Sequence, residues 1–237
     1  LVHNSVFAIA NKPMGAMLFQ VYMLFLVCWC AVIFKEEIMA FIQRFMPKLG
    51  FVGKIINVLE RITSPVEVIL FILAAVLGAY TGFLLSALIS YPMLNNPVLP
   101  ALFLASGTSS GIAATFLFIL IAGKLKGDSH ESHFIHKFEV PIMVTELGLL
   151  VCFFVGLYFG GGQKVVALEN ALSGFWGAVF WIGVFFIGIL IPLIANMFVS
   201  DRWKFNKNFI ILVSIFDLIG VLCLRYFILY AGQMTVA

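Results

Sequence analysis

Charged residues are scarce in this sequence, because Asp, Glu, Lys and Arg make up only 11% of its 237 residues. A soluble globular domain contains about 25% charged and about 45–50% apolar residues, whereas 63% of this chain is hydrophobic. So few charges cannot cover a folded core with a polar surface. The composition therefore excludes a soluble domain and predicts a protein surrounded by lipid.

Nucleotide-binding and metal-binding signatures are also missing. No Walker or GxGxxG pattern occurs, and the glycine run 160–162 leads into no strand and helix unit. The cysteines form no CxxC pair, and we interpret them as buried thiols that act as small apolar side chains. They are Cys28, Cys30, Cys152 and Cys223.

Histidine is absent from the apolar runs. His3 lies near the start of the chain, and His130, His133 and His136 share a charged segment. A haem within the membrane needs axial ligands from the helices themselves, so we expect no haem in this chain. We interpret the three clustered histidines as a solvated loop rather than a metal site, and we expect no metal.

Six apolar runs are long enough to cross a bilayer, which takes about 20 residues. They do not alternate between apolar and polar residues as the strands of a barrel do, so helices are expected. The fold class is therefore predicted to be all-α, a polytopic transmembrane helix bundle that forms a single domain over 1–237. The runs are 13–34, 66–91, 98–123, 138–159, 175–198 and 209–230.

Charged and apolar residues are mixed between the first two runs, over 35–64. Apolar residues recur there with helical spacing, at Ile38, Phe41, Ile42 and Phe45. This pattern predicts an amphipathic helix on the cytoplasmic membrane surface. We expect the segment to break into two at Pro47, Gly50 and Gly53.

Lysine and arginine are distributed unevenly between the joining segments. Of 14 such residues, 11 lie in alternate segments, Lys12 and Lys164 lie in the others, and Arg225 lies inside the last run. Basic loops stay in the cytoplasm, so both ends of the chain, 92–97 and 160–173 are predicted on the outer side. The predicted cytoplasmic segments are 35–64, 124–137 and 202–207.

Polar residues deep in a membrane helix are functional candidates because burying a charge in lipid is costly. Glu146 and Asp217 each lie about 12 Å from the cytoplasmic end of their runs at 1.5 Å per residue, and they are candidates for a proton path. Glu67 and Glu139 lie at the cytoplasmic edges, where they can reach water and admit protons.

The outer half of the bundle offers other polar groups, namely Tyr80, Arg225 and the hydroxyls near Ser106. Two alternatives stay open from the residues alone. Asp217 and Arg225 can simply pair with each other, and Tyr80 can be a packed tyrosine. We interpret Ser109 and Ser110 as small residues that allow helices to approach closely.

Several segments together resemble the NrfD/PsrC family, the membrane subunits of nitrite, polysulfide, thiosulfate and tetrathionate reductases. They are KPMGA at Lys12, GAYTGFLLS at Gly78, NNPVLP at Asn95, LFLASGTSSGIAA at Leu102 and LRYFILYAGQ at Leu224. The family fold has eight helices, so the resemblance implies that the first two helices are absent from this sequence. The family's aromatic-rich segment after the first-helix proline is replaced here by Met14, Gly15 and Ala16.

The resemblance implies a function in the bacterial inner membrane. Family members bind a quinone (menaquinone or ubiquinone) without haem and exchange electrons with a ferredoxin-like iron–sulfur subunit, which serves a molybdopterin or multihaem catalytic subunit. Tyr80 corresponds to the family tyrosine at the quinone headgroup. Ser106 and Arg225 are expected to shape the same site.

The outer turn at Asn95, Asn96 and Pro97 is expected to dock the partner subunits from the periplasm, and no nucleic acid is expected as a partner. Two other functions stay possible from the sequence. A secondary transporter or channel would use the buried charges as a solute path, although no internal repeat is visible. A purely structural anchor would bind no quinone at all.

Overall fold

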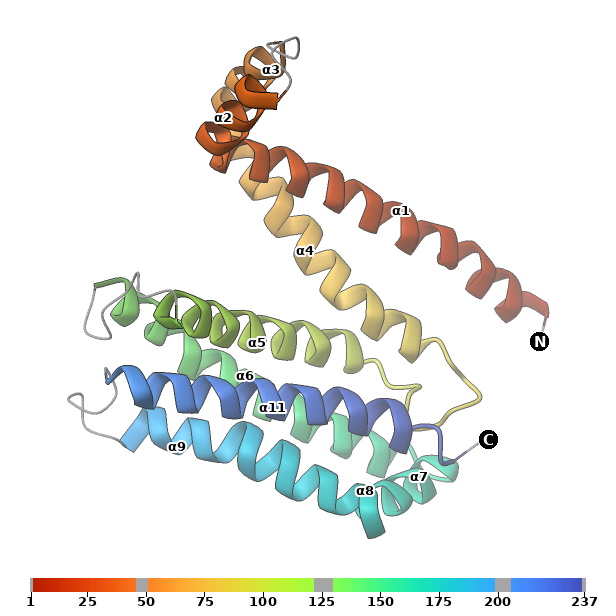
Figure 1. Cartoon of the computed structure of the whole chain (residues 1–237). Coiled ribbons are helices and arrows are strands. Elements are labelled where there is room, and N and C mark those ends of the chain that lie inside the picture. The colour runs from red at the N-terminus through yellow and green to blue at the C-terminus, as the bar shows by residue number, and fades with distance from the viewer. Residues whose placement is uncertain (1, 46–50, 122–129, 199–205, 236–237) are drawn as a thin grey trace. The chain divides into compact units, whose positions relative to one another are not determined.

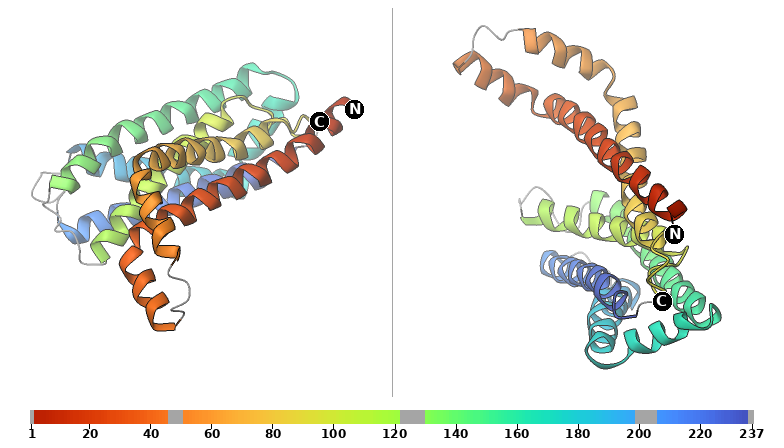
Figure 2. Two further views of the ribbon diagram at one scale, coloured as in Figure 1. Left: turned by 90° about the horizontal axis from the view of Figure 1, so that it is seen from above. Right: turned by 90° about the vertical axis from the view of Figure 1, so that its right-hand side faces the viewer.

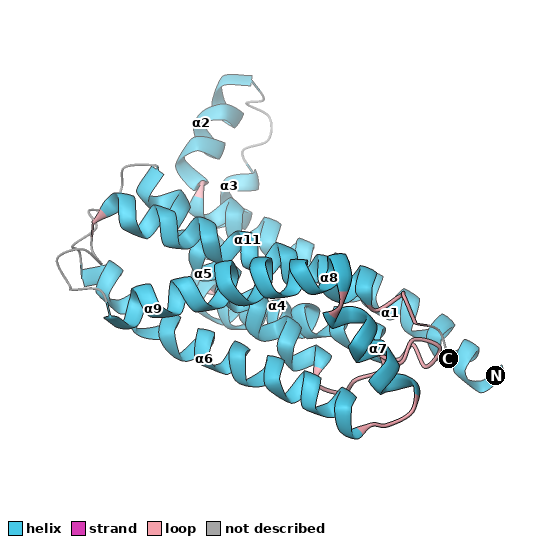
Figure 3. Cartoon of the chain, turned by 90° about the horizontal axis from the view of Figure 1, so that it is seen from below, coloured by secondary structure: helices cyan, strands magenta, loops and turns pink. Residues whose placement is uncertain are grey.

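The computed structural model describes residues 2–45, 51–121, 130–198 and 206–235, and these ranges contain helices and turns but no strand (Figures 1 and 3). Six of the described helical segments are long and apolar enough to cross a membrane, which confirms the all-α, six-span prediction. They are Gly15–Ile33, Thr63–Ser86, Leu99–Ile121, Lys137–Phe159, Gly174–Phe198 and Lys207–Ala231.

The protein forms two compact units, Leu1–Tyr80 and Thr81–Ala237. The single domain expected over 1–237 stays a prediction. In both units large apolar side chains face outward, for example Phe71, which is 76% exposed, and Phe159, which is 80% exposed. Such surfaces suit a lipid surrounding, because lipid tails need no polar cover.

The first unit contains α1 (Val2–Ile33), α2 (Lys35–Phe45), α3 (Phe51–Arg61) and α4 (Thr63–Ser86) up to Tyr80. Helices α2 and α3 lie together at one end of α1 and α4 (Figure 2).

The predicted amphipathic segment is thus two helices, joined by an ion pair of 2.7 Å between Lys35 Nζ and Glu60 Oε2. Gly53 does not break the segment as predicted, since it lies inside α3 with the Met39 side chain beside it. Pro47 and Gly50 lie outside the described residues.

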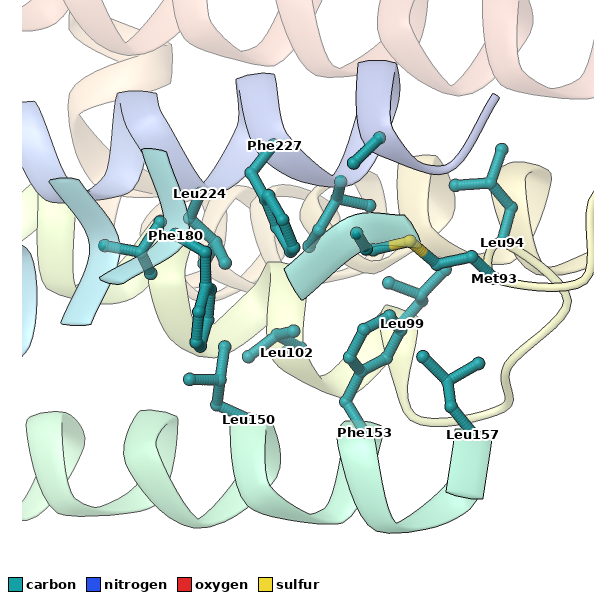
Figure 4. Packing of buried hydrophobic residues seen from close by; sticks show 14 of the residues in the cluster. Met93, Leu94, Leu99, Leu102, Leu150, Phe153, Leu157, Phe180, Leu224 and Phe227 are labelled. Atoms are coloured by element: carbon teal, nitrogen blue, oxygen red, sulfur yellow. The ribbon is translucent and has the colours of Figure 1, made fainter. Parts of the chain in front are cut away.

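The second unit is a bundle of α5 (Leu99–Ile121), α6 (His130–Phe159), a fifth span of three consecutive helical segments and α11 (Lys207–Ala231). Its core is a buried apolar cluster to which all these elements contribute. In Figure 4, Leu102, Leu150 and Phe180 point toward one another from three different elements. Aromatic pairs strengthen the packing, with the rings of Phe180 and Phe227 5.1 Å apart.

The fifth span consists of α8 (Gly174–Ala178), the π-helical segment η2 (Val179–Leu190) and α9 (Ile191–Phe198). Periodicity did not predict the π-helical turns. Gly188 of η2 meets Gly220 of α11 so closely that a Cβ on either residue would overlap the other's Cα. The two helices therefore cross with backbone against backbone, as small residues allow in membrane bundles.

The second span ends earlier than predicted, at Ser86 instead of Tyr91. Residues 87–97 form turns, and the Asn95 side chain donates a hydrogen bond of 2.9 Å to the Ser86 carbonyl. This bond occupies a carbonyl that the helix end leaves without an internal partner. The apolar run continues past the helix because the turn is itself buried at Met93 and Leu94.

The segment 160–173, predicted on the outer side, contains the helix α7 (Gln163–Leu172). Gly161 and Gly162 have φ angles of 64° and 52°, which glycine adopts readily, and they turn the chain from α6 into α7. Ala167 and Ala171 bury one face of α7 in the core. Helix α7 and the end of α11 lie at the same end of the unit (Figure 1). Asn170 of α7 donates a hydrogen bond to Thr235, which follows α11 in the chain.

The prediction that the cysteines are buried is wrong. All four are free, Cys152 is exposed, and the other three are half-buried. Cys152 lies on an outward face, whereas Cys223 packs against the apolar core of the second unit.

Candidate functional site

The second unit contains a buried group of polar side chains inside its apolar bundle. Its members come from α5, α6 and α11 and share an exposed fraction of 6% or less. Burial of so many polar groups in a lipid-facing bundle is costly unless they bond with one another. They are Ser106, Ser109, Glu139, Glu146, Ser214 and Asp217.

Asp217 is held by a hydroxyl from another helix. Ser109 Oγ lies 3.1 Å from both Oδ1 and Oδ2 of Asp217, which connects α5 with α11. The interpretation of Ser109 as a packing residue missed this bond. Only the helix crossing could have revealed it, because the two residues are 108 positions apart.

The acidic residues of this group lie close enough to interact electrostatically. Asp217 interacts with both Glu139 and Glu146, and Glu146 also interacts with Arg225. Counted from the predicted cytoplasmic start of each span, Glu139 lies about 3 Å in, Glu146 about 14 Å, Asp217 about 15 Å and Arg225 about 27 Å. The charged side chains thus form a series along the bundle, in which the acidic side chains lie nearer the predicted cytoplasmic end than Arg225 does.

Arg225 is held by α5. Its Nη2 donates to the Phe103 carbonyl at 3.0 Å and to Ser106 Oγ at 3.4 Å. The guanidinium also lies 4.1 Å from the centre of the Phe103 ring, a cation–π contact. Ser106 and Arg225 are therefore brought together as expected for one polar site, and no hydrogen bond between Arg225 and Asp217 is found among the described residues.

Tyr80 belongs to the first unit, near the end of the second span. Its side chain is half-buried, and its ring lies against the backbone of α1 at Gly15. A phenol in such a position can both donate and accept a hydrogen bond.

The two glutamates expected at the cytoplasmic edge have different surroundings. Glu67 is exposed, and its Oε1 accepts a hydrogen bond of 3.1 Å from the Trp29 indole N–H. Glu139 is only 6% exposed. The expectation that both reach water is therefore wrong for Glu139, which belongs to the buried acidic group instead.

The outer turn proposed for docking is built firmly into the second unit. Asn96 is buried, and its Nδ2 donates to the Phe153 carbonyl at 3.0 Å while its Oδ1 accepts from the Val98 backbone. The Asn95 carbonyl accepts a hydrogen bond of 3.1 Å from Lys164 Nζ. Pro97 is exposed and faces outward, so a docking role stays a prediction that now falls mainly on Pro97 and its neighbours.

No group of three or more His, Cys, Asp or Glu side chains able to hold a metal occurs within the described parts of the chain. The side chains of His3, His130, His133 and His136 lie outside these parts. What the described site offers is proton chemistry, because carboxyl groups can bind and release protons while hydroxyls orient them.

One further buried polar residue escaped the sequence analysis. Asn196 of α9 is 5% exposed, and neither atom of its amide bonds to another described residue. A buried asparagine with four hydrogen-bonding positions is otherwise expected to find partners. The sequence places Asn196 in an apolar run, but a single uncharged amide side chain did not indicate that the residue is buried.

Comparison with known proteins identifies relatives along nearly the whole chain. The family model described as polysulphide reductase, NrfD, matches residues 2–237. A protein NrfD homolog of Haemophilus influenzae is 85% identical over 224 residues, which cover 94% of this chain and 70% of the relative.

Two more distant relatives match as well. Protein NrfD of Escherichia coli is 47% identical over 225 residues, covering 94% of this chain and 70% of its own length. A subunit of the polysulfide reductase of Wolinella succinogenes is 38% identical over 190 residues, covering 79% of this chain and 59% of its own length.

Proposed function

Because the chain belongs to the NrfD polysulphide reductase family, we propose that it is the quinone-interacting membrane subunit of a multisubunit respiratory oxidoreductase. The observation that carries this proposal is the family match, which runs through all six predicted spans. One of the relatives is itself named as part of a polysulfide reductase. The terminal substrate is assigned to a catalytic partner, since the described residues form spans and short joining segments.

The reaction assigned to the membrane subunit is oxidation of a quinol, or its reverse. Conversion of a quinol to a quinone releases two electrons and two protons, and the protein must provide for both. Tyr80 is the proposed headgroup ligand, with its phenol hydrogen-bonded to a quinone oxygen. Either menaquinone or ubiquinone satisfies this chemistry.

Ser106 and Arg225 are proposed to contribute to quinone binding as well. Their mutual hydrogen bond supports a preorganised polar group in the outer half of the second unit. A guanidinium there can donate to a carbonyl or phenolate oxygen, which suits either redox form of a quinone.

The protons are proposed to move along the acidic series of the second unit. Glu139, Asp217 and Glu146 would pass protons to one another within the bundle. Their mutual electrostatic interactions support the route, because the charge on each depends on the protonation of its neighbours. Glu67, which is exposed, is proposed as a surface proton acceptor on the cytoplasmic side.

The electrons require a partner. We place a ferredoxin-like iron–sulfur subunit against the outer turn at Asn95, Asn96 and Pro97, on the periplasmic side of a bacterial inner membrane. It would connect the quinone with a molybdopterin or multihaem catalytic subunit. The positive-inside distribution of lysine and arginine supports this orientation.

The experiment that tests the proposal is mass analysis of the intact assembly, isolated from native membranes in mild detergent. We expect a stoichiometric iron–sulfur protein together with a molybdopterin or multihaem subunit. Isolation of the protein alone, or only with copies of itself, would contradict the proposal.

The buried carboxylates also favour a second candidate, a secondary transporter, since charges within a bundle often mark a solute path. Solute movement catalysed by the protein alone in liposomes would support that alternative.

A further inference from the structure

Gly15 is the one buried residue of the 19 that form the first described span, Gly15–Ile33. Its neighbours along that span are exposed or half-buried, as lipid-facing residues are. What covers Gly15 is the phenol ring of Tyr80, from α4 of the same unit. The contact is therefore a local one between a glycine and the proposed quinone ligand.

The space at Gly15 is fully taken by this ring. A Cβ added to Gly15 would overlap Cε1, Cζ and Oη of Tyr80, which are the three atoms nearest to it. The ring cannot coexist in its present position with any side chain larger than hydrogen. Because a tyrosine side chain has only two rotatable bonds before the ring, the ring would have to change rotamer and carry its hydroxyl elsewhere.

Two other buried glycines, Gly82 and Gly188, serve a different purpose. At Gly188 and Gly82 the nearest atoms are backbone atoms, of Gly220 and Pro100 respectively. Those glycines let two segments of backbone approach each other. At Gly15 the nearest atoms all belong to the hydroxyl-bearing end of one side chain, so the glycine accommodates a phenol rather than a helix.

We infer that Gly15 is a positioning residue for Tyr80, which fixes where the phenol hydroxyl stands and thereby sets the affinity for the quinone headgroup. This inference rests on the proposed role of Tyr80 in quinone binding. Gly15 itself touches no quinone and takes no part in proton or electron transfer. Its contribution is to leave room on α1 for one particular placement of the ring.

The test is a double-mutant cycle on the full protein in lipid nanodiscs, with equilibrium binding of a short-chain naphthoquinone as the readout. Gly15→Ala and Tyr80→Ala are each expected to weaken binding about tenfold, the effect of one lost hydrogen bond. Gly15→Ala is expected to have no further effect when Tyr80→Ala is already present, since the ring that it displaces is gone.

Gly111→Ala is the matched control, because nothing lies within 4 Å of a Cβ at Gly111 and its binding should be unchanged. The melting temperature of each variant shows whether weaker quinone binding comes from a displaced ring or from poorer folding. Alanine favours a helix more than glycine does, so the helix propensity of α1 is not expected to fall in Gly15→Ala. If Gly15→Ala fails to fold, the double variant is expected to recover folding. Failure of the double variant to recover would overturn the inference.

The binding measurements distinguish the headgroup role of Tyr80 from the positioning role of Gly15. Unchanged naphthoquinone affinity in Tyr80→Ala would refute the headgroup role itself, and the inference about Gly15 falls with it. Weaker binding in Tyr80→Ala that Gly15→Ala does not share, or effects of the two changes that simply add, would refute the positioning role alone.

Discussion

Ser109 Oγ lies at 3.1 Å from each carboxylate oxygen of Asp217, so that α5 and α11 are joined through a buried hydroxyl and a buried acid. Asp217 is only 2% exposed, so solvent has little access with which to replace this donor. Ser109→Ala should therefore lower the free energy of unfolding in detergent by about 1–3 kcal/mol, the cost of an unpaired buried acceptor. Thermal or denaturant unfolding of the purified protein measures this loss.

Ser110→Ala is the control for that change. The Ser110 hydroxyl donates to the Gly107 carbonyl of its own helix, so its loss removes no contact between helices. Equal destabilisation by the two substitutions would argue against a specific role for the Ser109 bond.

Removal of the Tyr80 hydroxyl tests the headgroup assignment with the least change in shape. Tyr80→Phe keeps the ring against Gly15 and should slow quinol oxidation by the intact complex about tenfold, because one hydrogen bond to the headgroup is missing. Steady-state kinetics with a soluble quinol supply the measurement. Tyr22→Phe, on α1 of the same unit, should leave the rate unchanged. Full activity in Tyr80→Phe would show that Tyr80 is not a quinone ligand.

The acidic series predicts a linked loss of turnover and proton uptake. Glu146→Gln and Asp217→Asn keep the size of each side chain but abolish its ability to release a proton. We expect proton uptake from the cytoplasmic side to fall at least tenfold in each variant, an effect typical of the loss of a proton-transfer group. A pH indicator trapped in proteoliposomes follows the protons while quinol oxidation is recorded.

Glu169→Gln provides the comparison, since Glu169 is an exposed residue of α7 outside the acidic series. If both buried variants turn over normally and take up protons at the normal rate, protons follow another route.

Asn96 is expected to contribute mainly to the free energy of unfolding and only secondarily to docking of a partner subunit. Its amide donates to the Phe153 carbonyl and accepts from the Val98 backbone, and it is 3% exposed. Asn96→Ala removes both hydrogen bonds from a buried position and should cost about 1–3 kcal/mol. Asn208→Ala, at an exposed position, should cost almost nothing. Normal stability of Asn96→Ala combined with loss of the partner subunit would instead assign Asn96 directly to docking.

The crossing of η2 and α11 leaves no room for side chains at its centre. Gly220→Val would force the two backbones apart at Gly188 and should destabilise the second unit by about 1–3 kcal/mol or more. The melting temperature of the purified protein reports the effect, and Gly111→Ala, in open space, is the reference. A wild-type melting temperature in Gly220→Val would show that the helices do not meet there.

Some features of the protein could be read from local sequence. Each span is a run of about 20 apolar residues, and hydropathy over such a window depends on nothing outside it. The uneven placement of lysine and arginine likewise predicts orientation from counting alone. The family resemblance required only short segments such as the one around Tyr80. For these features no knowledge of neighbouring helices was needed.

Prediction from the sequence was less successful where apolar residues lie outside a membrane span. The turn at Met93 and Leu94 is apolar because it is buried, so hydropathy alone extended the second span past Ser86. Helix α7 is short and of mixed composition, and it packs on the core through two buried alanines together with Leu168 and Leu172. In both cases the local sequence pattern carried no information about which part of the folded protein the segment would pack against.

By itself the sequence determined that lipid surrounds this protein, how many helices are available to cross it and which charged residues lie among them. The tertiary structure alone decided which of those residues meet. Ser109 and Asp217 are 108 positions apart, and Arg225 finds Phe103 across 122 positions. Hydropathy is a property of neighbours along the sequence, whereas a hydrogen bond between helices depends on their rotation and crossing, which packing of the whole bundle fixes.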